Sequence, residues 1–268
     1  MTAKVALITG ASTGIGHATA SLLHARGWIV YGVSRSIEQL SPKPPFISAN
    51  VDVTKESDVV TVLERIARDS KRLDAVVNCA GYALAGSIEE TSIEAGRAQL
   101  ETNFLGVANV CRLALPLLRA QGTAHVVNVS SIAGHVPMAF QGYYSASKAA
   151  LTAFTRALRL EVFRDGVRVS LVEPGDFATN ITAARRFGHS VETSRYPAFA
   201  RTLAVINKDE KAAAPPNEVA ELIVRTLEKS NPRASYLVGP FIQRFAVTLR
   251  ALVPQRVFDW VLTKLYEL

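Results

Sequence analysis

Residues 4–16 read Lys4-Val5-Ala6-Leu7-Ile8-Thr9-Gly10-Ala11-Ser12-Thr13-Gly14-Ile15-Gly16, and this stretch decides the fold. Its apolar start predicts a buried strand, and the spacing of Ala18, Leu22 and Leu23 predicts a helix after the glycines. Such a turn brings the backbone close to a pyrophosphate and directs helix N-terminal amides at it. Tight turns also use glycine for steric reasons alone. No Gly-Lys-Ser/Thr follows, which argues against a P-loop.

Short apolar runs alternate with helical spacings from residue 4 to residue 174. This alternation predicts an α/β fold: a single doubly wound Rossmann-type parallel sheet flanked by helices. We expect one domain over 1–268, with a helical C-terminal extension at 240–268. After the first strand, the predicted strands are 28–33, 46–51, 73–77, 125–130 and 167–172, with a further candidate at 236–238.

The second predicted strand ends at Ser34-Arg35-Ser36, where an NAD-binding fold usually places an acid that holds the ribose hydroxyls. The planar fork of Arg35 can instead pair with a 2′-phosphate, so the sequence favours NADP(H) over an idle surface arginine. Asp52, after the third strand, either accepts from an adenine amine or caps the next helix.

Two later stretches carry small or polar residues at positions where a regular strand or helix usually has larger apolar ones. Asn78-Cys79-Ala80-Gly81 follows the fourth strand, and its small side chains leave room for a flat cofactor. Residues 92–119 form a long helical segment interrupted by Gly96, Asn103, Gly106 and Pro116, all poor choices for a helix interior. We expect a bend near Asn103 that frees polar groups to bind water.

Tyr144 and Lys148 lie four residues apart at the start of 144–163, which has helical spacing, so one helix face presents both. A nearby ammonium favours the phenolate, so Tyr144 becomes a plausible acid/base. Ser131 follows the strand at 125–130, and its hydroxyl can meet the phenol across a substrate. An isolated Tyr-x-x-x-Lys more often means a buried aromatic ring with a snorkelling lysine, so the context decides.

The composition narrows the class of protein. Thirty Lys and Arg residues against 23 Asp and Glu give a net charge of +7, which suits nucleic acid, an anionic membrane or an acidic ligand. No basic run of five residues supports nucleic acid. Cys79 and Cys111 fall in a predicted strand and helix, so we expect no disulfide, and no metal site is predicted. The first strand leaves no room for a signal peptide, so we expect a cytoplasmic protein.

Taken together, these pieces resemble the short-chain dehydrogenase/reductase family over residues 3–180. The family's motifs occur in order as Gly10, Gly14 and Gly16, then Asn78-Cys79-Ala80-Gly81, then the quartet Asn103, Ser131, Tyr144 and Lys148, then Pro174, Gly175 and Thr179. Cys79 departs from the family's second asparagine, and we expect local repacking without loss of activity. Gly81-Tyr82, the Arg35 position and 143–148 look most like the hydroxysteroid- and retinol-dehydrogenase-like branch.

The resemblance implies an NADP(H)-dependent oxidoreductase that interconverts a secondary alcohol and a ketone or aldehyde. Ser131 would hold the carbonyl oxygen, Tyr144 would donate the proton, Lys148 would lower the phenol pKa and bind the nicotinamide ribose, and Asn103 would hold a water. The implied cofactor site comprises Gly10, Ser12, Thr13, Gly14, Ile15, Gly16, Arg35, Asp52, Val53, Asn78, Ala80, Gly81, Tyr144, Lys148, Pro174, Gly175, Phe177 and Thr179. Two alternatives stay open: a 3-oxoacyl-carrier-protein reductase, and a non-catalytic NADP(H)-binding sensor.

The C-terminal third carries no motif, so its pattern alone predicts its role. Residues 180–216 lose the strand and helix alternation, as a substrate lid does. Within 240–268, Pro254 separates two amphipathic helices, which carry Phe241, Phe245, Leu249 and Leu252, then Val257, Phe258, Val261, Leu262 and Leu265. They either cap an apolar substrate pocket or a subunit contact, or make a peripheral contact with an anionic membrane. Both interpretations of these helices favour a lipophilic substrate. The long helices expected at 92–119 and 144–163 predict a homodimer or homotetramer.

Overall fold

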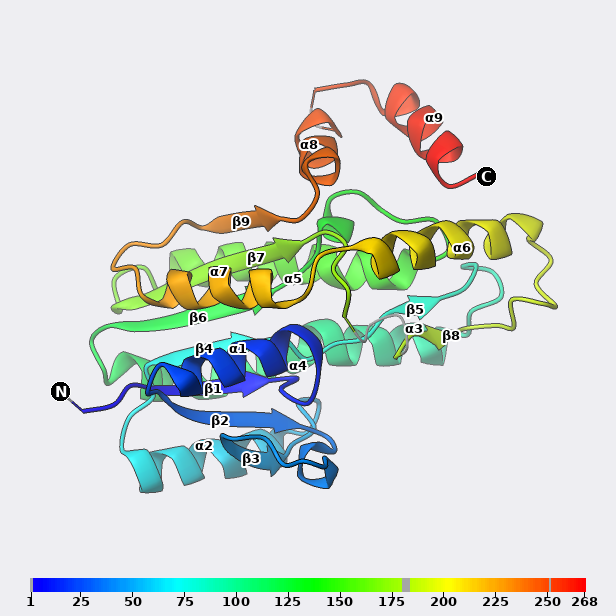
Figure 1. The fold of residues 1–268 in the computed structure, drawn as a ribbon. Helices are drawn as coiled ribbons and strands as arrows, with labels where there is room; N and C mark the ends of the chain where they lie inside the picture. The colour runs from blue at the N-terminus through cyan, green and yellow to red at the C-terminus, as the bar shows by residue number, and fades with distance from the viewer. Residues whose placement is uncertain (1, 180–183, 251) are drawn as a thin grey trace.

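The computed structural model describes residues 2–179, 184–250 and 252–268, and within them it contains a seven-stranded parallel sheet (Figure 1). The sheet order is β3 (Ile47–Asn50), β2 (Ile29–Ser34), β1 (Val5–Thr9), β4 (Ala75–Asn78), β6 (Ala124–Val129), β7 (Val167–Pro174) and β9 (Ser235–Val238). The strand order reverses at β1, with β2 on one side and β4 on the other. The predicted doubly wound sheet is confirmed, and each predicted strand is present within two or three residues of its expected ends.

Helices cover both faces of the sheet (Figure 1). On one face, α2 (Glu56–Ser70), α4 (Gly106–Arg119) and α5 (Gly142–Glu161) pack on the strands through aliphatic side chains. On the other face, α1 (Gly14–Ala25) and α7 (Asn217–Leu227) do the same. Because both faces are covered, the central strands are mostly apolar, and every residue of β1, β4 and β6 is buried.

The expected irregularity near Asn103 is a π-helical turn. α3 (Ile93–Leu100) runs into η2 (Glu101–Leu105), which runs into α4 without a break in the chain direction. A π-turn inserts one extra residue per turn and so releases part of the normal hydrogen-bond ladder. Asn103 is fully buried at this position, where its side chain faces the protein interior.

The range expected to be a lid contains regular structure that the sequence pattern did not predict. Residues 180–183 lie outside the described part of the chain. After them, β8 (Arg186–Phe187) pairs in parallel with β5 (Leu84–Ala85), and α6 (Pro197–Ala212) extends past the carboxyl ends of the strands (Figure 1). Glu90 ties this range to the core by accepting hydrogen bonds from Ser194 Oγ at 2.6 Å and the Arg195 amide at 2.8 Å.

The two predicted C-terminal helices are present on either side of Pro254, as α8 (Phe241–Arg250) and α9 (Gln255–Leu265). They extend beyond the β9 edge of the sheet and form no part of its two helix layers (Figure 1). No helix in the described residues has the length and apolar character needed to cross a membrane. Short 3₁₀ turns complete the fold at η1 (Ile37–Gln39) and η3 (Ile132–Gly134).

Candidate active site

Two cavities adjoin at the carboxyl ends of the central strands, where open α/β sheets bind their ligands. The first, which we call the catalytic cavity, measures about 220 Å³ and contains Ser131, Tyr144 and Lys148 in its wall. The second, the dinucleotide cavity, measures about 290 Å³ and is lined by the glycine turn after β1. Six residues line both cavities: Ile15, Cys79, Gly81, Tyr82, Val129 and Thr179. A ligand in one cavity therefore meets a ligand in the other.

The glycine turn packs so closely against backbone that side chains would not fit at two of its positions. Gly10 has φ +67°, and a Cβ there would lie 2.8 Å from the Ala80 amide nitrogen. A Cβ at Gly16 would lie 2.3 Å from the Gly10 carbonyl oxygen, so this turn cannot close around side chains. Gly14 has φ +57°, in the region that glycine adopts readily. With glycine at these positions, no large side chain separates the backbone at the N-terminus of α1 from the cavity, which suits a pyrophosphate.

The residues after β2 fit the ribose end of a dinucleotide. Ser34, Arg35 and Ser36 all line the dinucleotide cavity. The Ser34 Oγ is buried and has no hydrogen-bond partner among the described residues, so it is available to a bound ligand. Sequence reasoning quoted Ser34 but did not assign it, because a serine at a strand end carries no signal of its own. The unpredicted residues Thr102 and Arg186 also line this cavity.

Most of the predicted cofactor residues line one cavity or the other, but two behave differently from expectation. The Asn78 side chain lies beneath the cavities, where its Nδ2 donates to Asn128 Oδ1 at 2.9 Å, and it belongs to neither wall. Asp52 lines the dinucleotide cavity but does not cap α2. Its carboxylate accepts from the Thr54 amide at 3.0 Å and so holds the turn before that helix.

The three central catalytic candidates are brought together in the catalytic cavity. Tyr144 lies in the first turn of α5, and Lys148 lies one turn later on the same face. Ser131 follows β6, and its Oγ accepts from the Ala133 amide at 3.1 Å and donates to the Pro174 carbonyl at 3.4 Å. The Lys148 Nζ donates to the Val129 carbonyl at 3.0 Å and lies 5.9 Å from the centre of the Tyr144 ring.

The electrostatics of this cluster differ from the expectation that Lys148 lowers the phenol pKa. Burial raises the pKa of Tyr144 to about 12, a hydrogen bond with Ser131 opposes the rise, and the Glu210 and Asp176 carboxylates add to it. Burial lowers the pKa of Lys148 to about 8. The ammonium is directed at a backbone carbonyl, so burial and nearby acids control the phenol instead. Tyr144 is therefore protonated, as a proton donor must be, throughout the neutral pH range.

Asn103 lies behind the catalytic cavity and not in its wall. Its Oδ1 accepts from the Tyr82 amide at 3.1 Å, and its Nδ2 donates to the Tyr82 carbonyl at 3.0 Å and Ser147 Oγ at 3.2 Å. Protein partners thus occupy the side-chain amide. The Asn103 side chain positions the segment at Gly81 and Tyr82, which both cavities share.

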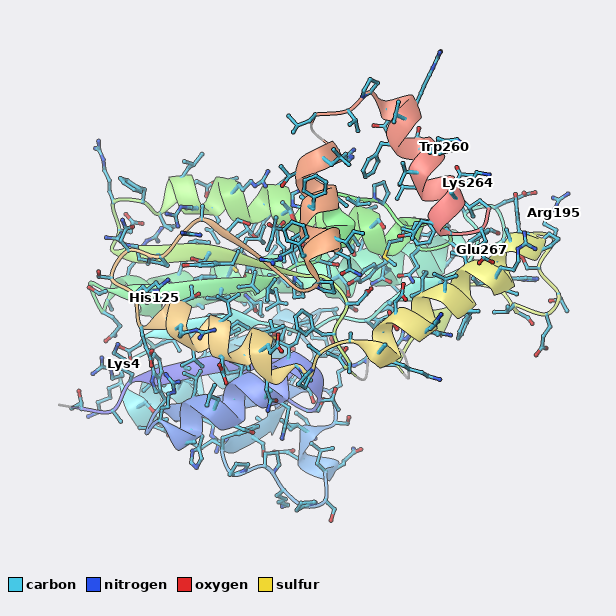
Figure 2. All side chains as sticks on the ribbon, turned by 45° about the horizontal axis from the view of Figure 1, so that its top comes forward. Lys4, His125, Arg195, Trp260, Lys264 and Glu267 are labelled. Carbon is cyan, nitrogen blue, oxygen red and sulfur yellow. The ribbon has the colours of Figure 1, made fainter. Side chains whose placement is uncertain are left out.

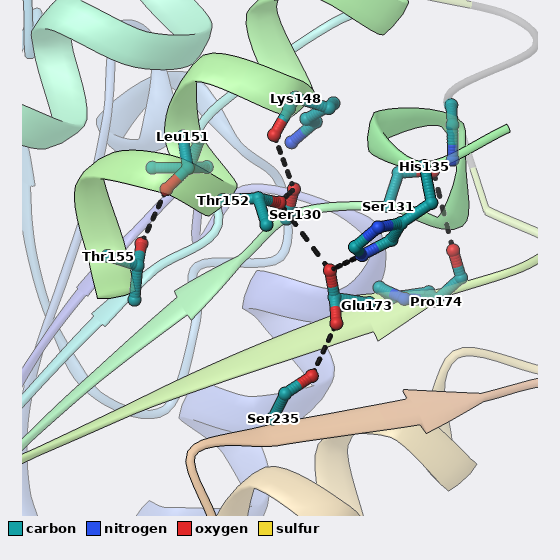
Figure 3. Close-up of polar contacts among 11 residues, drawn as sticks. Ser130, Ser131, His135, Lys148, Leu151, Thr152, Thr155, Glu173, Pro174 and Ser235 are labelled. Atoms are coloured by element: carbon teal, nitrogen blue, oxygen red, sulfur yellow. Dashed lines mark hydrogen bonds and ion pairs between the residues drawn. The ribbon is translucent and has the colours of Figure 1, made fainter. Parts of the chain in front are cut away.

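A buried carboxylate that the sequence analysis did not single out lies near Ser131 and Lys148 (Figure 3). Glu173 lies 2.5 Å from His135 Nε2, accepts from Thr152 Oγ1 at 3.5 Å and accepts from Ser235 Oγ. Thr152 in turn contacts Ser130, whose Oγ donates to the Lys148 carbonyl at 3.0 Å (Figure 3). This network joins β7, β9, η3 and α5 around the active residues.

The remaining wall of the catalytic cavity comes from the C-terminal third, which carries no motif. α6 contributes Ile206, Asp209 and Glu210, while α8 contributes Gln243 and Ala246. Leu262, Leu265 and Tyr266 of the α9 segment complete it. The wall is thus mainly apolar, with a group of acidic side chains on one side. Sequence reasoning named Leu262 and Leu265 in the helices that either cap the pocket or serve another contact, but it missed the others because only the tertiary fold brings them to the cavity.

The family model for short chain dehydrogenases matches residues 4–189. A 3-ketodihydrosphingosine reductase from Bacteroides thetaiotaomicron is 34% identical over 270 residues, which cover all of both chains. A probable short-chain type dehydrogenase/reductase of Helicobacter pylori is 33% identical over 258 residues, 95% of each chain.

Solved structures agree. A short-chain dehydrogenase from Streptomyces avermitilis superimposes with a TM-score of 0.81 at 31% identity, over 94% of this chain and 95% of that one. A Burkholderia phymatum short-chain dehydrogenase/reductase in complex with NAD has a TM-score of 0.80 over 94% of each chain, and at 24% identity it supports the fold alone. The ordered motifs, the sheet and these relatives place the chain in the short-chain dehydrogenase family of nicotinamide-dependent oxidoreductases.

Proposed function

We propose that this protein uses NADPH to reduce the ketone of a lipophilic substrate. The observation that carries the proposal is the junction of the two cavities, which brings a dinucleotide and a second ligand together beside Tyr144. Bound NADPH supplies the hydride. The hydroxysteroid or retinoid branch is not needed for this proposal, because the relative described as a 3-ketodihydrosphingosine reductase supports the same reaction type on a ketone.

The roles of the three residues follow from their surroundings. Tyr144 donates its proton to the carbonyl oxygen, which Ser131 holds through its hydroxyl. Lys148 would bind the nicotinamide ribose, and its pKa of about 8 keeps its ammonium mostly charged at neutral pH. Because its pKa is about 12, Tyr144 is almost wholly protonated at neutral pH, which is the form that reduction needs, whereas oxidation needs the phenolate. A water relay at Asn103 would have to use backbone groups freed by the π-turn, since its side-chain amide is occupied.

The choice of NADPH is supported by the charge at the end of β2. Arg35 is exposed at the rim of the dinucleotide cavity, next to the unpartnered Ser34 hydroxyl. A guanidinium pairs well with a phosphate dianion, and the segment 34–36 holds no carboxylate that would repel it. The wall formed by α6, α8 and α9 supports a lipophilic substrate and disfavours the open mouth that a carrier-protein reductase needs.

We further propose that α8 and α9 rest on an anionic membrane. Phe241 and Leu252 are 74% and 77% exposed, and Trp260 is 62% exposed. Trp260 and Lys264 lie on α9, away from the sheet (Figure 2). Basic side chains accompany the apolar ones at Arg244, Arg250, Arg256 and Lys264. An exposed apolar face with basic neighbours matches a surface of lipid and anionic headgroups, and it would pass a lipophilic substrate directly to the cavity.

A second copy of the chain on the α4 and α5 side stays a prediction. Leu105, Leu160 and Phe163 are exposed apolar side chains of this region. Such residues match the composition of a subunit contact.

We predict that Tyr144→Phe lowers ketone reduction by NADPH about 10²–10⁴-fold, because it removes the proton donor. The matched control is Tyr143→Phe, since the Tyr143 ring packs against Gly96 and lines neither cavity. Steady-state rates on a panel of lipophilic ketones measure the activity of both variants. Full activity in Tyr144→Phe would contradict the proposed mechanism.

We predict that NADPH binds about 10- to 100-fold more tightly than NADH, the ratio expected from one charge-assisted pair. Arg35→Ala should weaken NADPH binding by that factor and leave NADH binding nearly unchanged. Arg68→Ala, an exposed arginine on α2, serves as the control for the loss of one positive charge. Fluorescence titrations of both dinucleotides give the ratio, and a ratio that Arg35→Ala leaves unaltered would rule out the role of Arg35.

We predict that the intact protein floats with anionic vesicles in a density gradient, because α8 and α9 offer it an apolar and basic surface. Replacing both Phe241 and Trp260 by Glu should abolish flotation. Phe163→Glu, which changes an exposed aromatic side chain just after the end of α5, should not. If the folded wild-type protein does not float, the two helices serve only the cavity or a subunit contact.

A further inference from the structure

The catalytic cavity has an acidic side close to Tyr144. Asp176 follows β7, and Asp209 and Glu210 lie at the end of α6, and all three line the cavity. The carboxylates are close enough to act on one another, since Glu210 and Asp209 add to the effect of burial in raising the pKa of Asp176. Burial raises the pKa of the Tyr266 phenol, which lines the same cavity, and Asp176 and Asp209 add to that rise.

The positive charge nearby balances only part of this group. The Arg185 Nη2 donates to Glu210 at 2.6 Å, and its Nη1 donates to Asn207. Asp176 accepts from the neutral Gln243 amide, while the Asp176 backbone donates back to Gln243 at 2.9 Å. Across the described ranges, no Lys, Arg or His forms a salt bridge with Asp176 or Asp209. The cavity wall therefore keeps uncompensated negative charge.

A second, independent feature of the same cavity points to a polar ligand. Gln141, just before α5, is only 3% exposed and lines the cavity. Its Nε2 is buried and has no hydrogen-bond partner in the described part of the protein. A buried donor without a partner costs about 1–3 kcal/mol, which a bound acceptor would recover. The remainder of the wall is aliphatic, through Val136, Met138, Ile206, Leu262 and Leu265.

Resting on the function proposed above, we propose that the substrate is a long-chain ketone that carries an ammonium group beside its carbonyl. The ammonium would lie against Asp176 and Asp209, and the Gln141 amide would donate to an oxygen of the same head group. The alkyl chain would lie along the aliphatic wall toward α9. The carbonyl then meets Ser131 and Tyr144, because all these residues share one cavity.

The test compares two ketones of equal chain length, a long-chain α-aminoketone and its N-acetyl derivative, which lacks the positive charge. With NADPH, the wild-type protein should reduce the amine with a kcat/KM about 10- to 100-fold higher. Asp176→Asn and Asp209→Asn should each lower this ratio. Glu221→Gln removes a carboxylate on the exposed face of α7 and should leave the ratio as it is. Dinucleotide titration confirms that each variant is folded.

The outcomes separate this inference from the function on which it rests. Equal reduction of both ketones by the wild type would overturn the ammonium site and leave the ketone reductase standing. A preference for the amine that neither Asp variant reduces would equally overturn the assignment to these carboxylates. Reduction of neither compound, by protein that binds NADPH, would overturn the inference together with the proposed function.

Discussion

The register of α5 on the sheet is the constraint on which the active site depends, and buried hydrogen bonds set it. Asn78 of β4 donates to Asn128 of β6 at 2.9 Å, and Asn128 donates to Thr155 of α5 at 3.0 Å. About two turns nearer the active site, Ser130 donates to the Lys148 carbonyl at 3.0 Å. A shift of the helix would leave several buried polar groups without partners, at about 1–3 kcal/mol each. Tyr144 and Lys148 are thereby fixed toward the cavity.

Charge placement then determines what this fixed constellation can do. Burial raises the pKa of Tyr144 and lowers the pKa of Lys148 to about 8. At neutral pH, Tyr144 is therefore a neutral phenol and Lys148 is mostly a charged ammonium. Within the acidic side of the cavity, Glu210 and Asp176 add to the rise in the Tyr144 pKa. Asp176, which we propose as a contact of a cationic substrate, thus also helps to hold the proton on Tyr144.

Much of the fold could be predicted from the sequence because buried parallel strands are continuous apolar runs, as at 125–130. The glycine turn and the pair of Tyr144 and Lys148 could also be predicted, since each depends on local spacing. β5 and β8 escaped prediction because two-residue strands have no period. Asn78 was assigned to the cofactor from its motif, whereas the structure uses it to hold β4, β6 and α5 together. The direction of the Tyr144 pKa shift depends on burial and on Glu210 of α6, and no local sequence pattern reveals either.

The central claim is that dinucleotide and ketone meet where the two cavities adjoin, with Gly81, Val129 and Thr179 in both walls. Direct transfer between them can be followed with NADPH deuterated at the transferable position of its nicotinamide. Mass spectrometry of the alcohol formed from a lipophilic ketone then reports the origin of the new hydrogen on carbon. The account predicts one deuterium on the former carbonyl carbon, delivered without exchange with water. If the alcohol carries no deuterium at that carbon, whichever face of the nicotinamide is deuterated, the hydrogen comes from solvent and the account is contradicted.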